Sequence, residues 1–133
     1  MDEYNGYSRI IKENIEWDIL CESYPHDIGL LQGFYDLILE TLLYKNKKIL
    51  IASNFFPIQL VKSKFLKLNT SHIEYVIDCF NKITSEIDNS KKYQLAMLFN
   101  APTTISGYYL SKVNHDDYNM SVSKKQYEQG KVN

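Results

Sequence analysis

Apolar residues recur at helical spacing along most of this chain. Over residues 8–23 they step by three and four positions along one face, while charged side chains take the other, which predicts a helix capped by Ser8. Pro25 disfavours helical backbone in the residue before it, so this helix ends there and a second one follows over residues 25–44. The predicted apolar positions of the two helices are Ile11, Ile15, Trp17, Ile19, Leu20, Ile28, Leu31, Phe34, Tyr35, Ile38 and Leu42.

The period changes over residues 48–56. Ile49-Leu50-Ile51-Ala52 and Phe55-Phe56 flank Ser53-Asn54, which predicts a short β-hairpin that turns at Ser53-Asn54, because Asn tolerates left-handed backbone. A two-stranded hairpin is only marginally stable by itself, so we expect it to pack against the helices.

Helical spacing returns after the hairpin. It predicts helices over residues 58–68, 71–83 and 91–100, and a sixth that begins after Thr103 or Thr104. Ser71 and Glu74 have the spacing of a capping box, residues 88–90 form a loop, and Pro102 stops the fifth helix. The apolar stripes of these helices include Ile58, Val61, Phe65, Leu68, Ile73, Val76, Ile77, Phe80, Ile83, Ile105, Tyr108, Tyr109 and Val113.

The pattern therefore predicts a mainly α fold. Residues 1–118 are expected to form a single domain, a compact bundle of five or six helices with one short β-hairpin. Residues 119–133 are polar, and we expect a disordered tail. The core is expected to include Ile15, Ile19, Phe34, Ile38, Val61, Phe65, Ile73, Ile77 and Phe80.

Composition narrows the class of protein. The chain is 44% hydrophobic and 23% charged, as in ordinary globular proteins, and no apolar run approaches the ~20 residues of a membrane span. The acidic, polar N-terminus is unlike a secretory signal, so we expect a cytoplasmic protein with no membrane partner. Cys21 and Cys79 lie in apolar helical patterns and are expected to be buried free thiols.

Charge is unevenly distributed along the chain. Residues 1–46 carry a net charge of −6 and residues 47–133 a net charge of +5. No acidic residue occurs between Glu40 and Glu74, whereas six lysines do. This stretch fits a surface for phosphate backbones or for an acidic protein, and it fits a solvated lysine face equally well.

Two features invite a nucleic-acid hypothesis. The helices over residues 58–68 and 71–83 have the outline of a helix-turn-helix, although the early residues of the second lack the Arg, Asn or Gln side chains best suited to base edges. Tyr109 near Lys112 could stack on a base while the lysine meets a phosphate. The candidate interaction surface comprises Lys62, Lys64, Lys67, Tyr109 and Lys112.

Catalytic and metal-binding motifs are not found. His26 beside Asp27, and His115 beside Asp116, lack a third ligand at a diagnostic spacing, so no metal is expected. The five glycines are isolated and form no phosphate loop, and no triad or dyad is recognisable. We expect no enzyme activity and no cofactor.

Five segments resemble the C-terminal domain of RepA-type replication initiators of Gram-positive plasmids and mobile elements. They are Val61-Lys62-Ser63-Lys64-Phe65-Leu66-Lys67-Leu68-Asn69 and residues 11–21, 71–76, 99–109 and 113–116, so the resemblance covers roughly residues 7–118. A remoter similarity is to the DnaD family of primosomal proteins. That family often has a Tyr-x-x-x-Ile-x-x-Trp pattern, where this chain has Tyr93, Met97 and Asn100.

The resemblance implies a helical, non-catalytic domain that recruits host replication proteins of the helicase-loader or primase type to a plasmid or mobile element. The winged-helix domain with which such initiators bind the origin has no counterpart in the matched residues. An alternative is a DNA-binding helical module that uses the lysine-rich surface. Salt dependence separates the two, because phosphate contacts weaken steeply with salt and an apolar protein interface does not.

Overall fold

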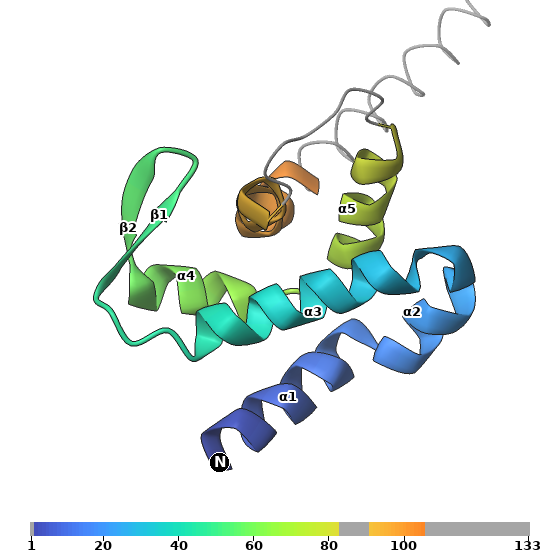
Figure 1. Ribbon diagram of the computed structural model, residues 1–133, viewed down its shortest axis with the longest axis horizontal. Helices are drawn as coiled ribbons and strands as arrows, with labels where there is room; N and C mark the ends of the chain where they lie inside the picture. Colours follow the sequence, from blue (N-terminus) through green and yellow to red (C-terminus); the bar gives the residue numbers. More distant parts are fainter. Residues whose placement is uncertain (1, 83–90, 106–133) are drawn as a thin grey trace, which may run out of the picture. The chain divides into compact units, whose positions relative to one another are not determined.

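The computed structural model describes residues 2–82 and 91–105 of the 133 residues. The chain divides into two units, residues 1–102 and 103–133. The described elements are α1 (Asp2–Ile15), α2 (Trp17–Ser23), the 3-10 turn η1 (Pro25–Asp27), α3 (Ile28–Leu42), β1 (Lys48–Ile51), β2 (Asn54–Pro57), α4 (Ile58–Phe65), α5 (Thr70–Lys82) and a last helix over residues 91–105. The predicted mainly α fold with one short β-hairpin is confirmed (Figure 1).

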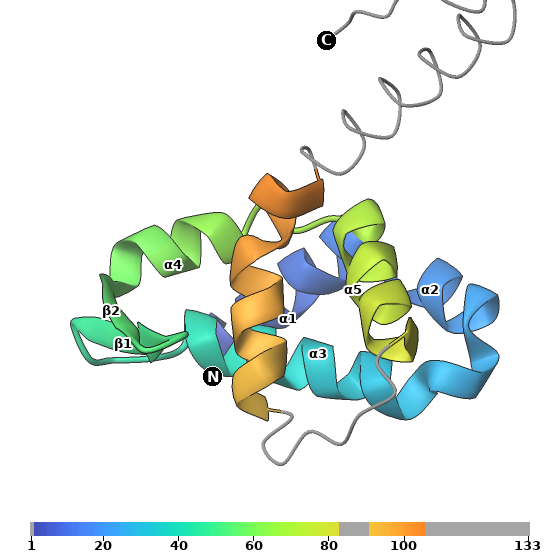
Figure 2. The same ribbon diagram turned by 90° about the horizontal axis from the view of Figure 1, so that it is seen from above.

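Helix α3 lies at the centre of the first unit. Figure 1 shows α1 on one side of α3, with α5 and residues 91–102 on the other, and Figure 2 gives the view from above. The periodic apolar face predicted for α3 is buried, except that Ile28 is exposed because residues 25–27 form a 3-10 turn and the α-helix begins only at Ile28. Phe34, on the side of α3 that faces α5, places its ring 5.7 Å from that of Phe80.

The predicted helix over residues 8–23 is two helices. It begins earlier, at Asp2, and breaks at Glu16, whose backbone is left-handed (φ 55°, ψ 62°). The break shifts the helical phase, so that Leu20 is fully buried while Ile19 is 51% exposed, and the prediction of Ile19 as a core residue is wrong. Ser8 lies inside α1, where it hydrogen-bonds the Tyr35 hydroxyl instead of capping a helix.

The hairpin forms where it was predicted, with its turn one residue earlier. Ile51 pairs with Asn54, so the turn residues are Ala52 and Ser53, which have positive φ angles of 52° and 70°. Positive φ at both central positions is the geometry of a type I′ turn, whose twist matches that of the strands. Ile49 and Ile51 point toward the core, as their burial shows.

The segment from α4 to α5 carries the predicted apolar stripe. Ile58, Val61, Phe65 and Leu68 are all buried, although α4 itself ends at Phe65. The predicted capping box of Ser71 and Glu74 is wrong, because the helix begins at Thr70 and the box is formed by Asn69 and His72. The His72 N–H donates to Asn69 Oδ1 at 3.1 Å, and the Asn69 N–H donates to His72 Nδ1 at 3.0 Å.

Of the remaining predictions, most of those on the core are confirmed, the one on Pro102 is wrong, and several concern residues outside the described ranges. Seven predicted core residues are buried, Phe80 is half-buried, and Ile19 is the exception above. Residues 101–105 are helical, so Pro102 does not stop the last helix; its ring removes only one backbone hydrogen bond, to Leu98. Ile83, the loop 88–90, Tyr108, Val113 and the predicted tail 119–133 lie outside the described residues.

Candidate functional site

The structure separates the lysines that the sequence grouped together. Lys67 is exposed in the turn after α4, whereas Lys62 and Lys64 are half-buried on α4. Lys64 Nζ lies 4.4 Å from the centre of the Phe99 ring, a cation–π contact inside the first unit. The Lys64 ammonium therefore packs on a ring, whereas Lys67 is exposed and Lys62 is partly accessible to solvent. The other two candidates, Tyr109 and Lys112, lie outside the described residues.

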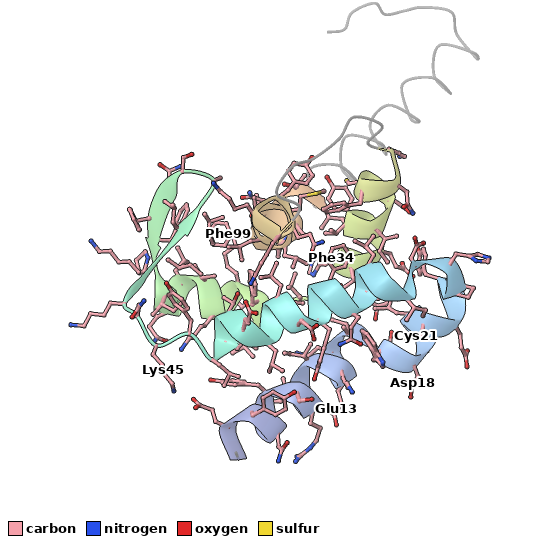
Figure 3. The ribbon with its side chains drawn as sticks, in the orientation of Figure 1. Glu13, Asp18, Cys21, Phe34, Lys45 and Phe99 are labelled. Atoms are coloured by element: carbon pink, nitrogen blue, oxygen red, sulfur yellow. The ribbon has the colours of Figure 1, made fainter. Side chains whose placement is uncertain are left out.

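The contact of Lys64 with Phe99 belongs to a cluster that holds the hairpin in place. The ring of Phe56, on β2, lies 4.7 Å from the ring of Phe99. Phe99 is on the last helix, and its side chain points toward the hairpin (Figure 3). Aromatic pairs at this separation contribute beyond the area they bury. The inner side of the hairpin is thereby fixed to the helices, which leaves its other side facing solvent.

The outer side of the hairpin is apolar and exposed. Leu50 and Phe55 are cross-strand partners there, with exposed fractions of 45% and 68%. Lys48 and Pro57, paired two residues further along, are exposed on the same side. We call Lys48, Leu50, Phe55 and Pro57 the hairpin face. The hairpin face thus places an exposed aromatic beside an exposed aliphatic side chain, with a lysine at the margin.

A pocket opens between α3, β1 and residues 91–102. It has a volume of about 230 Å³ and we call it the α3 pocket; its lining comprises Leu37, Glu40, Thr41, Tyr44, Ile49, Lys91, Lys92 and Leu95. A neighbouring hollow of about 270 Å³ shares Leu37, Glu40 and Lys91 with it. Lys91 Nζ and Glu40 Oε1 form an ion pair of 3.0 Å where the two hollows meet. The sequence did not predict this pocket, since its two walls are about fifty residues apart.

Two titratable side chains, His72 and Cys21, have pKa values shifted by their surroundings in the fold. Burial lowers the pKa of His72, whose Nδ1 accepts the capping hydrogen bond, so this side chain is occupied at the helix start and does not point outward as a reader of bases. Burial and the nearby Asp18 carboxylate raise the pKa of the Cys21 thiol, and α2 places both residues at one end of the unit (Figure 3). Neither cysteine is in a disulfide.

The described residues contain neither a metal-binding cluster nor a helix that could span a membrane. In residues 2–82 and 91–105 no three His, Cys, Asp or Glu side chains are grouped so that they could hold a metal ion. No helix in this part of the chain has the length and apolar character needed to cross a membrane.

Comparisons with known proteins give one match. No curated protein matches the chain, and no solved structure matches it. The model of one family does match, over residues 1–120, which is most of the chain. The chain therefore belongs to DUF6017, a family of unknown function.

Proposed function

We propose that this chain is a non-catalytic module of replication initiation, which recruits a host replication protein to a plasmid or mobile element in the cytoplasm. The observation that carries the recruiting role is the hairpin face, where Phe55 and Leu50 stand exposed side by side. The link to replication rests on the resemblance of residues 7–118 to the C-terminal domain of RepA-type initiators.

The energetics favour a protein partner at the hairpin face. Full burial of a side chain the size of Leu or Phe stabilises an association by about 1.5–3 kcal/mol. Aromatic anchors near the centre of an interface commonly dominate its affinity. Phe55 is well suited to that role, because its strand is held by the packing of Phe56 on Phe99 and little ordering is needed on binding.

The test uses purified host helicase, helicase loader and primase, each titrated against the full chain by calorimetry. We expect one of them to bind, and the double variant Leu50→Ser/Phe55→Ser to weaken that binding at least tenfold. Ile19→Ser is the matched control, since it removes an exposed apolar side chain from α2. Equal binding by the double variant and the control would place the interface elsewhere, and binding to none of the three proteins would remove the proposal.

A second candidate function is DNA binding by a helical module, and one specific observation favours it. Lys67 is exposed and Lys62 is half-buried, within a stretch that lacks acidic residues from 41 to 73. Each phosphate that a lysine neutralises adds nearly one unit to the salt slope of binding, so Lys62→Ser/Lys67→Ser should flatten that slope by about two units. Lys64 is left unchanged, because its substitution would also remove the contact with Phe99. Tight binding of duplex or single-stranded DNA at physiological salt would favour this candidate over recruitment.

A further inference from the structure

One backbone hydrogen bond determines which peptide groups of the hairpin point outward. The Ile58 N–H donates to the Lys47 carbonyl at 2.8 Å, so these two residues form a hydrogen-bonded pair. Directly opposed residues of an antiparallel ladder alternate between hydrogen-bonded and non-hydrogen-bonded pairs. Lys48 with Pro57 and Leu50 with Phe55 are therefore non-hydrogen-bonded pairs, whose N–H and C=O groups point away from the neighbouring strand.

The two outer edges of the hairpin are not equivalent. On β2 the outward position Pro57 has no N–H to offer, and the strand ends there because α4 begins at the next residue (Figure 2). On β1, Lys48 and Leu50 direct both N–H and C=O groups outward, and no third strand is paired with them in the described part of the chain. The β1 edge is thus the one that can accept an added strand.

The α3 pocket lies beside this edge. Ile49 belongs to β1 and points to the inner side of the hairpin, where it lines the pocket with Leu37 and Leu95. A strand added about 4.8 Å from β1 would point alternate side chains to that same inner side. One apolar side chain of the added strand would therefore reach the pocket while its backbone pairs with Lys48 and Leu50.

The charges around the edge select an acidic occupant. Lys47 and Lys48 are exposed at the start of β1. Among the described residues that line the pocket, Lys91 and Lys92 are basic and Glu40, which is paired with Lys91, is acidic. A basic segment would meet like charges here, whereas carboxylates on the added strand would meet lysines.

We infer that the β1 edge and the α3 pocket bind an extended, acidic segment of a partner protein, which adds a strand to the hairpin and places one apolar side chain in the pocket. This inference rests on the proposed recruitment function and deepens it by naming the chemistry of the partner. Nucleic acid and an anionic membrane surface are the competing occupants in the test.

The test titrates the ¹⁵N-labelled full chain with a blocked peptide, Glu-Leu-Glu-Val-Glu-Val. Two further peptides of the same sequence are N-methylated at alternate residues, one at the odd and one at the even positions, which removes hydrogen-bond donors without changing charge. A strand presents alternate amides to its neighbour, so one N-methylated peptide should bind like the parent and the other at least tenfold more weakly. Hydrogen exchange at the Lys48 and Leu50 amides should slow at least tenfold with the parent peptide.

Variants of the chain give the matched control for charge. Lys48→Glu should weaken the peptide at least fivefold, while Lys67→Glu, the same change at an exposed lysine away from β1, should weaken it less than twofold. The inference is overturned if both N-methylated peptides bind like the parent, or if exchange at Lys48 and Leu50 is unchanged. It is also overturned if an oligonucleotide or phosphatidylglycerol vesicles displace the peptide at physiological salt.

The outcomes separate this inference from the proposed function. If the peptide pairs with β1 but no host replication protein binds, the proposed function is rejected and the inference that the β1 edge binds a strand is retained. If a host replication protein is captured through Leu50 and Phe55 but the peptide does not bind, the edge falls and recruitment stands.

Discussion

The junction between α1 and α2 and the turn of the hairpin both rely on left-handed residues that are not glycine, but they are secured differently. At the junction, the Thr70 hydroxyl lies 2.9 Å from the Ile15 carbonyl and 2.6 Å from a Glu16 carboxylate oxygen, and the Asn14 amide donates to the Leu66 carbonyl at 3.0 Å. These bonds span more than fifty residues of sequence. The hairpin turn has one weak local side-chain bond, from Asn54 to the Ala52 carbonyl at 3.3 Å.

The two regions differ in how many long-range interactions hold them. At the junction, Ile15 and Leu20 are buried, and long-range hydrogen bonds hold the backbone. The hairpin buries one side only and leaves Leu50 and Phe55 exposed, and within residues 2–82 and 91–105 no third strand pairs with it. A region with fewer long-range constraints and exposed apolar surface is suited to meeting a partner, whereas the helical region supports it.

The largest expected difference between the helical region and the hairpin is between Phe65 on α4 and Phe55 on β2. Phe65 is 2% exposed in the core, so Phe65→Ala should lower the free energy of unfolding by about 3–5 kcal/mol. Phe55→Ala should change it by less than about 0.5 kcal/mol, because Phe55 is mostly in solvent. Urea denaturation followed by circular dichroism measures both. Similar losses for the two variants would contradict the assignment of the hairpin face as exposed.

The junction can be weakened without disturbing the core. Thr70→Val keeps the shape of the side chain but removes the hydroxyl that contacts Ile15 and Glu16, and should lower stability by about 1–2 kcal/mol. Thr70→Ser retains the hydroxyl and serves as the control. Hydrogen exchange should accelerate around Glu16 in the Val variant, with no change at the hairpin. Unchanged stability would mean that the junction is held by packing alone.

The hairpin turn can be improved. Ala52 and Ser53 both have positive φ, so Ala52→Asn/Ser53→Gly, the preferred pair for a type I′ turn, should raise the free energy of unfolding by about 0.5–1 kcal/mol. Thermal denaturation measures the gain. Reversing the order, to Gly at 52 and Asn at 53, is the matched control and should gain less. A loss of stability in the Asn-Gly variant would refute the type I′ geometry.

The smallest expected effect is a pH dependence of the free energy of unfolding that arises at the start of α5. Burial lowers the pKa of His72 in the folded state, so its contribution to stability is present above its ordinary pKa of 6.5 and declines as the pH falls through the folded value. His72→Gln can still accept from the Asn69 N–H and does not titrate. We expect the wild type to lose more stability between pH 7 and pH 5 than this variant, as measured by urea denaturation. Parallel pH profiles would exclude the effect.

The packing of the lysine-rich stretch and the exposed side of the hairpin could not be predicted from the sequence. The lysine-rich stretch was visible as a run without acids, but the contact of Lys64 with Phe99 joins residues 35 positions apart and has no local signal. The exposed side of the hairpin was also hidden. Ile49, Leu50 and Ile51 are all apolar, so the alternation that normally marks the buried side of a strand is missing.

The sequence by itself determined the elements whose information is local. Apolar residues at helical spacing predicted the buried stripes of α3 and α4, and the change of period predicted the hairpin, because each depends on residues a few positions apart. Tertiary structure decided the rest. Glu16 is left-handed where Thr70, fifty-four residues later, contacts it, and that break exposes Ile19 and buries Leu20. Phe99 packs on Phe56 and so decides which side of the hairpin is buried, because the free energy of burial depends on which surfaces meet.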